Sequence, residues 1–433
     1  MNLHELGHRA AEAAYQLQKL SSADKNDVLQ MAAKALMRDS NNILKANVKD
    51  VSRAEAVGMH PGLVDRLRLD EGRIKSMADG LKEIIGLPDP IGEELESFTQ
   101  PNGLNIKKIR VPIGVIGIIY ESRPNVTADA FGLCFKAGNA VILKGGSDAI
   151  YTNKEIARSI RGALANCINN SDALQLIEST DRAVTSEFMK LNRYIDVLIP
   201  RGGAGLIQAV VNNSTVPVIE TGTGNCHIYV DESADIGKAV PIIVNAKTQR
   251  IGVCNSCESL VVHENVIAEL MTELIPALAP FHVELRGDEA CVNTLANLAV
   301  NTFKNADKDV EEILTNVVRA TEDDFNEEFL DYILSVKTVR NAAKAIVHIN
   351  EHSTKHSDAI IADDINVIAA FKNEVDSACV YVNTSTRFTD GFEFGFGAEI
   401  GISTQKLHAR GPMGLKELTS YKYTIESDYL ARP

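Results

Sequence analysis

Residues 111–125 read VPIGVIGIIYESRPN, an apolar run that ends abruptly in polar residues. The apolar part is far shorter than the roughly 18 residues that a membrane helix needs, and it has the length of a buried strand. Further along the chain, similar runs alternate with helical patterns. The predicted strands are 111–119, 140–143, 174–177, 195–199 and 216–219, and the predicted helices run to 136, over 151–167 and over 204–212. This alternation predicts an α/β fold with a mostly parallel, doubly wound sheet.

Polar residues and glycines follow four of these predicted strands. They are Glu121 to Asn125, Lys144 to Ser147, Arg201 to Gly203, and Glu220 to Gly222. In a doubly wound sheet, ligands bind beyond the carboxyl ends of the strands. Any one of these segments could be an ordinary turn, because turns favour glycine and capping residues. Four together, with two arginines, a lysine and two glutamates, favour a ligand site.

A glycine-rich helix start lies among these turns. Gly202, Gly203 and Gly205 open the predicted helix, and free N–H groups at such a start can hold a diphosphate. Neither G-x-G-x-x-G after a strand nor a P-loop motif is present, so this feature is a weak signal by itself.

Composition limits the class of protein. With 433 residues, the chain is long enough for two or three domains, and a net charge of -14 disfavours a nucleic-acid partner. The N-terminus lacks a basic and apolar signal segment, and seven cysteines are an odd number, which favours free thiols over disulfides. We therefore expect a cytoplasmic protein with no membrane or nucleic-acid partner.

Two features stand outside the alternating region. Residues 1–50 have apolar positions at helical spacing, with Ser22 and Asp24 as start signals, and predict a helical hairpin. Residues 96–110 place Asn102-Gly103 between two strand-like arms, which predicts a β-hairpin. A protruding hairpin offers edges for pairing between subunits.

Cys254 lies on a glycine-flanked loop, Gly252 to Asn255, after a helical stretch 236–247 and before an apolar strand 259–262. Most cysteines are buried and inert, but the loop and the nearby Arg250 provide the open, electropositive setting that a thiolate needs. Cys254 and Cys257 form a C-x-x-C, but no further ligands complete a zinc set, so we expect Cys257 to be a small buried residue.

Three histidines recur at helical spacing and raise the question of a metal site. His348, His352 and His356 could form one face of a helix, but Asn350, Ser353 and Thr354 between them favour a loop. We expect no metal.

Seven segments together resemble one known family. They are Arg123 to Thr127, Ala137 to Ser147, Glu220 to His227, Gly252 to Asn255, His356 to Ile360, Phe396 to Thr404, and Ala409 to Pro412. They are similar to the gamma-glutamyl phosphate reductase family of the aldehyde dehydrogenase superfamily, over nearly the whole chain. Two departures are Ile251, where many members have proline, and the pair Ser256-Cys257.

The resemblance implies an aldehyde dehydrogenase-like fold with three parts. A Rossmann-like cofactor-binding domain covers 1–226, with the hairpin 96–110 used for oligomerisation and a return of the chain near 380–404. An α/β catalytic domain covers 227–379, and a C-terminal oligomerisation segment covers 405–433. The implied assembly is a homodimer or homotetramer, with possible delivery of substrate by contact with a glutamate kinase.

The resemblance also implies the reaction, NADPH-dependent reduction of L-glutamyl 5-phosphate to L-glutamate 5-semialdehyde and phosphate in proline biosynthesis. Cys254 would form the thioester and Asn125 would stabilise the oxyanion, although Asn125 could instead cap a helix. Glu220 stands where the superfamily has its general base. A base that activates water would hydrolyse the thioester, so Glu220 could instead deprotonate Cys254, exclude water or be structural.

The matched positions also supply ligand-binding residues. For NADPH they are Lys144, Gly145, Gly146, Ser147, Gly202, Gly203 and Glu328. For the anionic substrate they are Arg123, Arg250, His356 and Arg410. Ser147 replaces a glutamate common in NAD-preferring relatives, which favours NADP(H), although Asp148 keeps this open. Glu328 could equally belong to a solvated acidic face with Glu327.

Two alternatives remain at this stage. The first is an oxidative aldehyde dehydrogenase that hydrolyses its thioester, which Glu220 would favour and which would turn over without phosphate. The second is a cofactor-binding protein that has lost catalysis, which the intact Cys254, Asn125 and Glu220 disfavour.

Overall fold

The structure is a computed structural model that describes residues 2–432. The chain forms two compact units. The first unit consists of the chain up to Thr221, Gly391–Gly401 and the chain from Leu407. The second unit consists of Gly222–Asp390 and Ile402–Lys406. The chain thus passes to the second unit slightly before the predicted boundary after residue 226.

The first unit contains a four-stranded parallel sheet. Its strands are β3 (Val115–Tyr120), β4 (Ala140–Gly145), β5 (Leu174–Leu176) and β6 (Val197–Arg201), in the spatial order β5-β4-β3-β6. In chain order this is third, second, first, fourth, the order of a Rossmann-type half. The predicted doubly wound fold is therefore confirmed. The segment predicted as a fifth strand makes only one bridge, between Leu198 and Val218.

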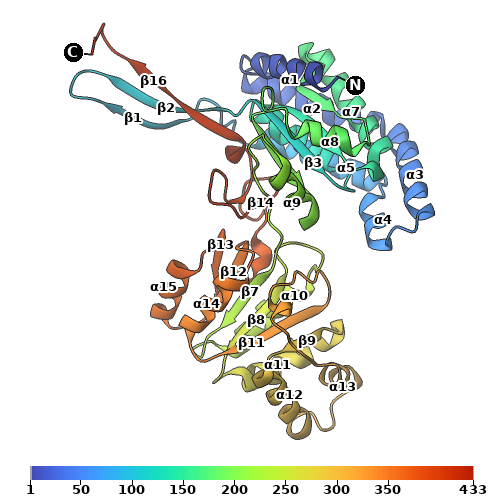
Figure 1. Cartoon of the computed structure of the whole chain (residues 1–433), viewed down its shortest axis with the longest axis vertical. Coiled ribbons are helices and arrows are strands. Elements are labelled where there is room, and N and C mark those ends of the chain that lie inside the picture. Colours follow the sequence, from blue (N-terminus) through green and yellow to red (C-terminus); the bar gives the residue numbers. More distant parts are fainter. Residues whose placement is uncertain (1, 433) are drawn as a thin grey trace. The chain divides into compact units, whose positions relative to one another are not determined.

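Helices pack around this sheet (Figure 1), and most of them share one apolar core with it. They are α1 (Leu3–Leu17), α2 (Ser22–Arg38), α3 (Ser40–Ala56), α4 (Pro61–Leu67), α5 (Glu71–Gly86), α6 (Val126–Lys136), α7 (Ile150–Ile168), α8 (Arg182–Phe188) and α9 (Ala204–Asn213). The predicted start near Ser22 and Asp24 is confirmed, because Ser21 and Asp24 form a capping box at α2.

A three-stranded antiparallel arm extends from the first unit (Figure 1). Its strands are β1 (Glu94–Thr99), β2 (Asn105–Pro112) and β16 (Thr419–Glu426), with β2 in the centre. The predicted hairpin is confirmed, and Gly103 takes the left-handed conformation in its turn, with φ +95°. The C-terminal β16 completes the arm from the far end of the sequence, and most of its residues are exposed.

The second unit is built on a seven-stranded sheet in the order β10-β9-β11-β8-β7-β12-β13, in which every pairing is parallel. The strands are β7 (Cys226–Val230), β8 (Cys257–His263), β9 (Glu284–Gly287), β10 (Val318–Arg319), β11 (Ile333–Val339), β12 (Ser357–Ile361) and β13 (Cys379–Val382). The helices are α10 (Ile236–Thr248), α11 (Ile267–Leu278), α12 (Glu289–Asn301), α13 (Lys308–Thr315), α14 (Ala342–His352) and α15 (Ile365–Glu374). Two short strands, β14 (Ile402–Ser403) and β15 (Gly411–Pro412), lie near the end of the chain.

The central strands of this sheet are buried on both faces. Ile228 and Val230 belong to the core under α10 and α11, whereas Tyr229 between them packs into the core with α14 and α15. Alternate side chains point to opposite faces of a strand, so a continuous apolar sequence serves two cores.

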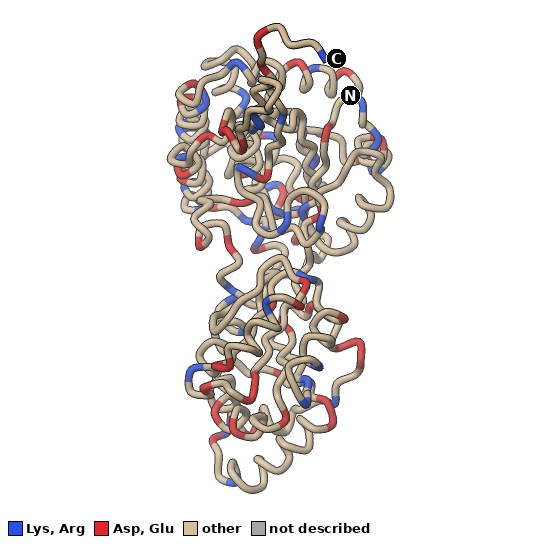
Figure 2. Tube along the Cα trace, turned by 90° about the vertical axis from the view of Figure 1, so that its left-hand side faces the viewer, with Lys and Arg blue, Asp and Glu red and all other residues tan. Residues whose placement is uncertain are grey.

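No helix among the described residues is long and apolar enough to cross a membrane. Basic and acidic residues are interspersed along the Cα trace of both units (Figure 2).

An ion pair lies inside the second unit. The ammonium group of Lys247, in the last turn of α10, contacts the Glu258 carboxylate at 2.6 Å, and both side chains are fully buried. The other carboxylate oxygen accepts the Leu330 N–H. A buried charge that loses its partner is strongly destabilising, whereas replacement of both charges by apolar groups is often tolerated.

We therefore predict that Lys247→Met lowers the free energy of unfolding of the second unit by about 3–5 kcal/mol, because it strands the Glu258 carboxylate. Lys238→Met is the matched control, since Lys238 also lies on α10 and its side chain is 80% exposed. The double variant Lys247→Met/Glu258→Leu should recover most of the lost free energy of unfolding. Urea unfolding followed by circular dichroism measures these effects, and equal stability of the two single variants would contradict the prediction.

Candidate active site

The Cys254 loop lies at the amino edge of the second sheet, between the end of α10 and the start of β8. Gly224, just before the neighbouring strand β7, packs so closely on this loop that a Cβ there would overlap the Cys254 carbonyl oxygen. The Ser256 hydroxyl donates to the Ala246 carbonyl oxygen at 3.3 Å and ties the loop back to α10. The segments that lead into two adjacent strands, β7 and β8, thus hold the predicted nucleophile.

The seven cysteines differ in burial and in the pKa of their thiols. Only Cys254 and Cys167 among the seven are not buried, and burial together with Asp27 raises the pKa of Cys167. Cys257 is fully buried, as predicted, and burial raises its pKa to about 12. The thiol of Cys226 is also buried, donates to the Cys254 carbonyl oxygen at 3.2 Å, and has a pKa held well above its usual value by burial. Cys254 is thus the partly open thiol of the second unit.

A buried polar chain continues behind Cys226. His356 Nδ1 lies 3.8 Å from the Cys226 sulfur and 2.8 Å from the Ser357 hydroxyl, which in turn bonds Thr389. His356 is fully buried, and burial lowers its pKa to about 4, so it is neutral at pH 7. The expectation of a direct substrate contact at His356 does not match this enclosed position, and the histidine instead supports the loops from behind.

Glu328 is not part of a solvated acidic face. Its carboxylate is half-buried and accepts the Gly224 N–H at 2.7 Å. Burial raises the pKa of this carboxyl, while the Gly224 bond opposes the shift. The residue predicted to contact the nicotinamide ribose therefore holds the same backbone that packs on Cys254.

One arginine at this site has no counterpart in the sequence-based prediction. Arg387 lies in the short 3-10 helix η5 (Thr386–Phe388), and its Nε donates to the Gln249 side chain at 2.8 Å, next to the exposed Arg250. The only sequence signal was its position within the predicted return of the chain near 380–404, which did not place it beside Cys254.

In the first unit, the predicted cofactor residues lie at the carboxyl ends of β4 and β6, which flank β3. The strands β3 and β6 lie side by side. This is the switch point of a doubly wound sheet, where the connections leave in opposite directions. The Glu121 N–H donates to the Arg201 carbonyl oxygen at 3.1 Å, and the Glu121 carboxylate accepts the Gly203 N–H at 2.9 Å. An anionic side chain thus stands at the helix start predicted to hold a diphosphate.

The turn after β4 suits a phosphorylated ribose. Lys144 is buried, its ammonium group donates to the Gly145 carbonyl oxygen at 2.9 Å, and burial lowers its pKa. Ser147 is exposed at the start of the 3-10 helix η1 (Ser147–Ala149). Asp148 accepts hydroxyl bonds from Ser122 at 2.9 Å and from Ser147 at 3.4 Å, so neighbouring hydroxyls already engage this carboxylate.

Asn125 does not cap helix α6. It occupies the N-cap position but makes no side-chain cap bond, and its amide instead donates to Asp129 at 2.8 Å. The alternative role as a helix cap is therefore not observed. Burial raises the pKa of Asp129 to about 6, and the Asn125 bond and the Arg201 charge partly oppose this shift.

The other predicted residues of the first unit come from three separate segments of the chain. Arg123 is exposed after Ser122, which has φ +31°, Glu220 is half-buried after the Val218 bridge, and Arg410 is half-buried. These residues belong to a different unit from Cys254.

The three spaced histidines do not share one site. His348 and His352 lie on α14, with ring centroids 4.4 Å apart and ring planes tilted by 42°. The predicted loop was wrong at Asn350, which lies on the helix, but it is confirmed at Ser353 and Thr354. Among the described residues, the one group with three possible metal-ligand atoms within 4.8 Å is His282, Asp309 and Glu312, all of them exposed.

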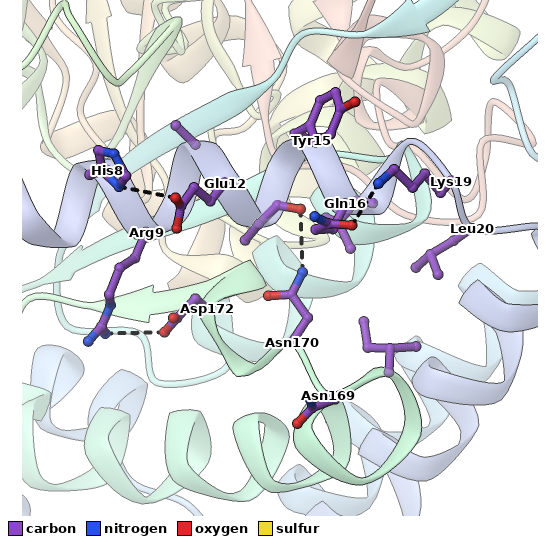
Figure 3. A pocket seen from close by; sticks show the side chains of 14 residues that line it. His8, Arg9, Glu12, Tyr15, Gln16, Lys19, Leu20, Asn169, Asn170 and Asp172 are labelled. Carbon is purple, nitrogen blue, oxygen red and sulfur yellow. Dashed lines mark hydrogen bonds and ion pairs between the residues drawn. The ribbon is translucent and has the colours of Figure 1, made fainter.

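A separate hollow of about 940 Å³ lies between α1 and the end of α7 (Figure 3). Its polar side chains already pair with one another, for example Arg9 with Asp172 at 3.1 Å. It precedes β5, at the amino edge of the sheet and away from the predicted cofactor residues.

Comparison with known proteins identifies the family. The model of the aldehyde dehydrogenase family matches residues 2–299. The gamma-glutamyl phosphate reductase of Lachnospira eligens is 55% identical over 424 residues, covering 98% of each chain. The chain belongs to this family. The crystal structure of the Thermotoga maritima gamma-glutamyl phosphate reductase is 46% identical, with a TM-score of 0.92 and 99% of both chains covered. An acetylating aldehyde dehydrogenase from Geobacillus thermoglucosidasius, 19% identical with a TM-score of 0.66, shows the same fold.

The contact at Gly224 generates a prediction. Gly224→Ala should displace the Cys254 loop, because the added methyl group overlaps its carbonyl oxygen, and should slow alkylation of Cys254 by iodoacetamide roughly 10-fold or more. Gly237→Ala is the control, since its Cβ would meet only the Asp235 side chain at 3.6 Å. Mass spectrometry of the Cys254 peptide gives the rates, and unchanged labelling in Gly224→Ala would show that the contact does not position the thiol.

The Asp129 carboxyl generates a pH dependence. Its pKa is about 6 in the folded protein against 3.8 for an exposed group, so the folded state binds this proton more tightly. The resulting stabilisation is complete below about pH 4 and is lost as the pH rises through 6. Asp129→Asn should therefore gain up to about 3 kcal/mol relative to the parent protein between pH 4 and 7. Urea midpoints at several pH values test this, and parallel curves would refute it.

Proposed function

We propose that the chain reduces L-glutamyl 5-phosphate with NADPH to L-glutamate 5-semialdehyde and phosphate, the second step of proline biosynthesis from glutamate. The observation that carries the proposal is the partly exposed Cys254, which is held by the segments leading into β7 and β8 in a member of this family. An acyl phosphate suits this site, because a thiolate displaces phosphate readily whereas a free carboxylate resists attack.

In the proposed mechanism, the Cys254 sulfur attacks the carbonyl carbon, the C–S bond forms, and the C–O bond to phosphate breaks. The Asn125 amide and the Cys254 N–H stabilise the charge on the carbonyl oxygen, and Asp129 orients that amide. We assign Glu220 to removal of the thiol proton. The thiolate is restored when the aldehyde leaves.

NADPH supplies the hydride that reduces the thioester. Lys144, Gly145, Gly146 and Ser147 are proposed to hold its phosphorylated ribose, Gly202 and Gly203 its diphosphate after Glu121 withdraws, and Glu328 its nicotinamide ribose. Asp148 fits this cofactor because serine hydroxyls hold both of its oxygens, which reduces its repulsion of a 2′-phosphate. Arg123, Arg250 and Arg410 are proposed to bind the substrate anions.

Assembly and location complete the proposal. The exposed edge and face of β16, with Tyr421, Tyr423 and Ile425 more than half exposed, support a homodimer or homotetramer formed through the arm. We place the enzyme in the cytoplasm. Contact with a glutamate kinase stays a prediction.

A second candidate is an aldehyde dehydrogenase that hydrolyses its thioester, which the half-buried Glu220 favours. The reverse reaction separates the two. With glutamate semialdehyde and NADP⁺, the reductase forms NADPH only when phosphate is present, whereas the hydrolytic enzyme needs no phosphate.

Two variants test the assigned chemistry. Cys254→Ser should abolish turnover, and Asn125→Ala should lower kcat roughly 100- to 1,000-fold through loss of one oxyanion donor. Freshly generated acyl phosphate without NADPH should leave a glutamyl adduct on the Cys254 peptide in Asn125→Ala, slowly, and none in Cys254→Ser. An adduct on another cysteine would overturn the assignment of the nucleophile.

A further inference from the structure

The helix η5, which carries Arg387, is bound to the nucleophile loop immediately after Cys254. The Asn255 amide donates to the carbonyl oxygens of Arg387 at 3.2 Å and Thr389 at 2.9 Å. In return, the Thr386 hydroxyl donates to the Asn255 carbonyl oxygen at 2.7 Å. Asn255 is buried, so these three bonds fix the backbone of η5 against the residue next to the nucleophile.

The Arg387 side chain reaches the other flank of the same loop. Its Nε donates to the Gln249 side chain at 2.8 Å, whereas its own carbonyl is held by Asn255. The arginine therefore spans the loop from the residue after Cys254 to a residue five positions before it. Because one donor of the guanidinium is fixed on Gln249, the orientation of the planar group is set before any ligand arrives.

A second arginine lies within electrostatic range of this guanidinium. Arg250 follows Gln249, and its charge lowers the pKa of Arg387 after the larger effect of burial. Cys254, Asp390 and Cys226 act in the opposite direction. Two like charges beside a thiol are unfavourable in the free protein, and a multiply charged anion between them relieves the repulsion.

We infer that Arg387, together with Arg250, binds the phosphoryl group of the acyl phosphate beside the sulfur of Cys254. This inference rests on the proposed function and names its leaving-group site. When the C–S bond forms and the C–O bond breaks, the electron pair of that bond stays with phosphate. The two guanidinium groups stabilise the added negative charge, and phosphate takes its proton from solvent after it departs.

The reverse reaction tests this site with inorganic phosphate as the probe. With glutamate semialdehyde and NADP⁺ held constant, Arg387→Gln should raise the KM for phosphate roughly 10-fold or more, because a charge-assisted contact is lost. The KM for NADP⁺ and for the aldehyde should change less than about twofold. Arg387→Lys should lie between, since lysine keeps the charge but not the fork. Arg340→Gln, an exposed arginine of the same unit, is the control.

Phosphate binding without turnover provides a second measurement. Inorganic phosphate should protect Cys254 of the parent enzyme from iodoacetate, an anionic reagent, and Arg387→Lys should need more phosphate for equal protection. Thermal unfolding checks that each variant is folded, and the lysine variant keeps the test open if Arg387→Gln does not fold.

The outcomes are distinct. A lower kcat with unchanged KM for phosphate and unchanged protection would make Arg387 a support for the loop and would overturn the inference. Phosphate-independent turnover by the parent enzyme would instead overturn the proposed function itself.

Discussion

The close packing of two backbones, at Gly224 and Cys254, is the constraint on which the second unit depends. These residues precede neighbouring parallel strands, so the geometry of the sheet brings their loops together. A glycine at this point lets the carbonyl group of Cys254 approach closely, because no side chain lies between the two backbone segments. Glu328 then holds the N–H of the same glycine. The nucleophile and the carboxylate predicted to contact the cofactor are therefore positioned by one shared segment of backbone.

Burial gives chemically similar residues around this contact different properties. Three thiols lie in the region, but only Cys254 is partly open, and burial raises the pKa of Cys226 and Cys257. Burial likewise keeps His356 neutral behind them. Burial thus keeps these neighbouring thiols and the imidazole uncharged, whereas Arg250 and Arg387 bring positive charge to the Cys254 loop.

The two units differ in the charge at the positions where anions are predicted to bind. In the second unit, Arg250 and Arg387 lie close enough to repel each other. In the first unit, the opposite arrangement occurs, because the Glu121 carboxylate occupies the start of α9. A helix start attracts anions, and here a side chain of the protein occupies it.

The sequence by itself determined the elements and most of the residues with chemistry. Apolar period and turn residues predicted the doubly wound sheet and the 96–110 hairpin, because these depend on neighbouring residues, and motifs spread along the chain, including the one around Cys254, showed the resemblance to the family. Tertiary structure alone decided that His356 is enclosed, that Asn125 bonds Asp129 instead of capping α6, and that Arg387 joins the nucleophile loop. These outcomes depend on burial and on contacts between segments as distant as Asn255 and Arg387, which no local pattern encodes.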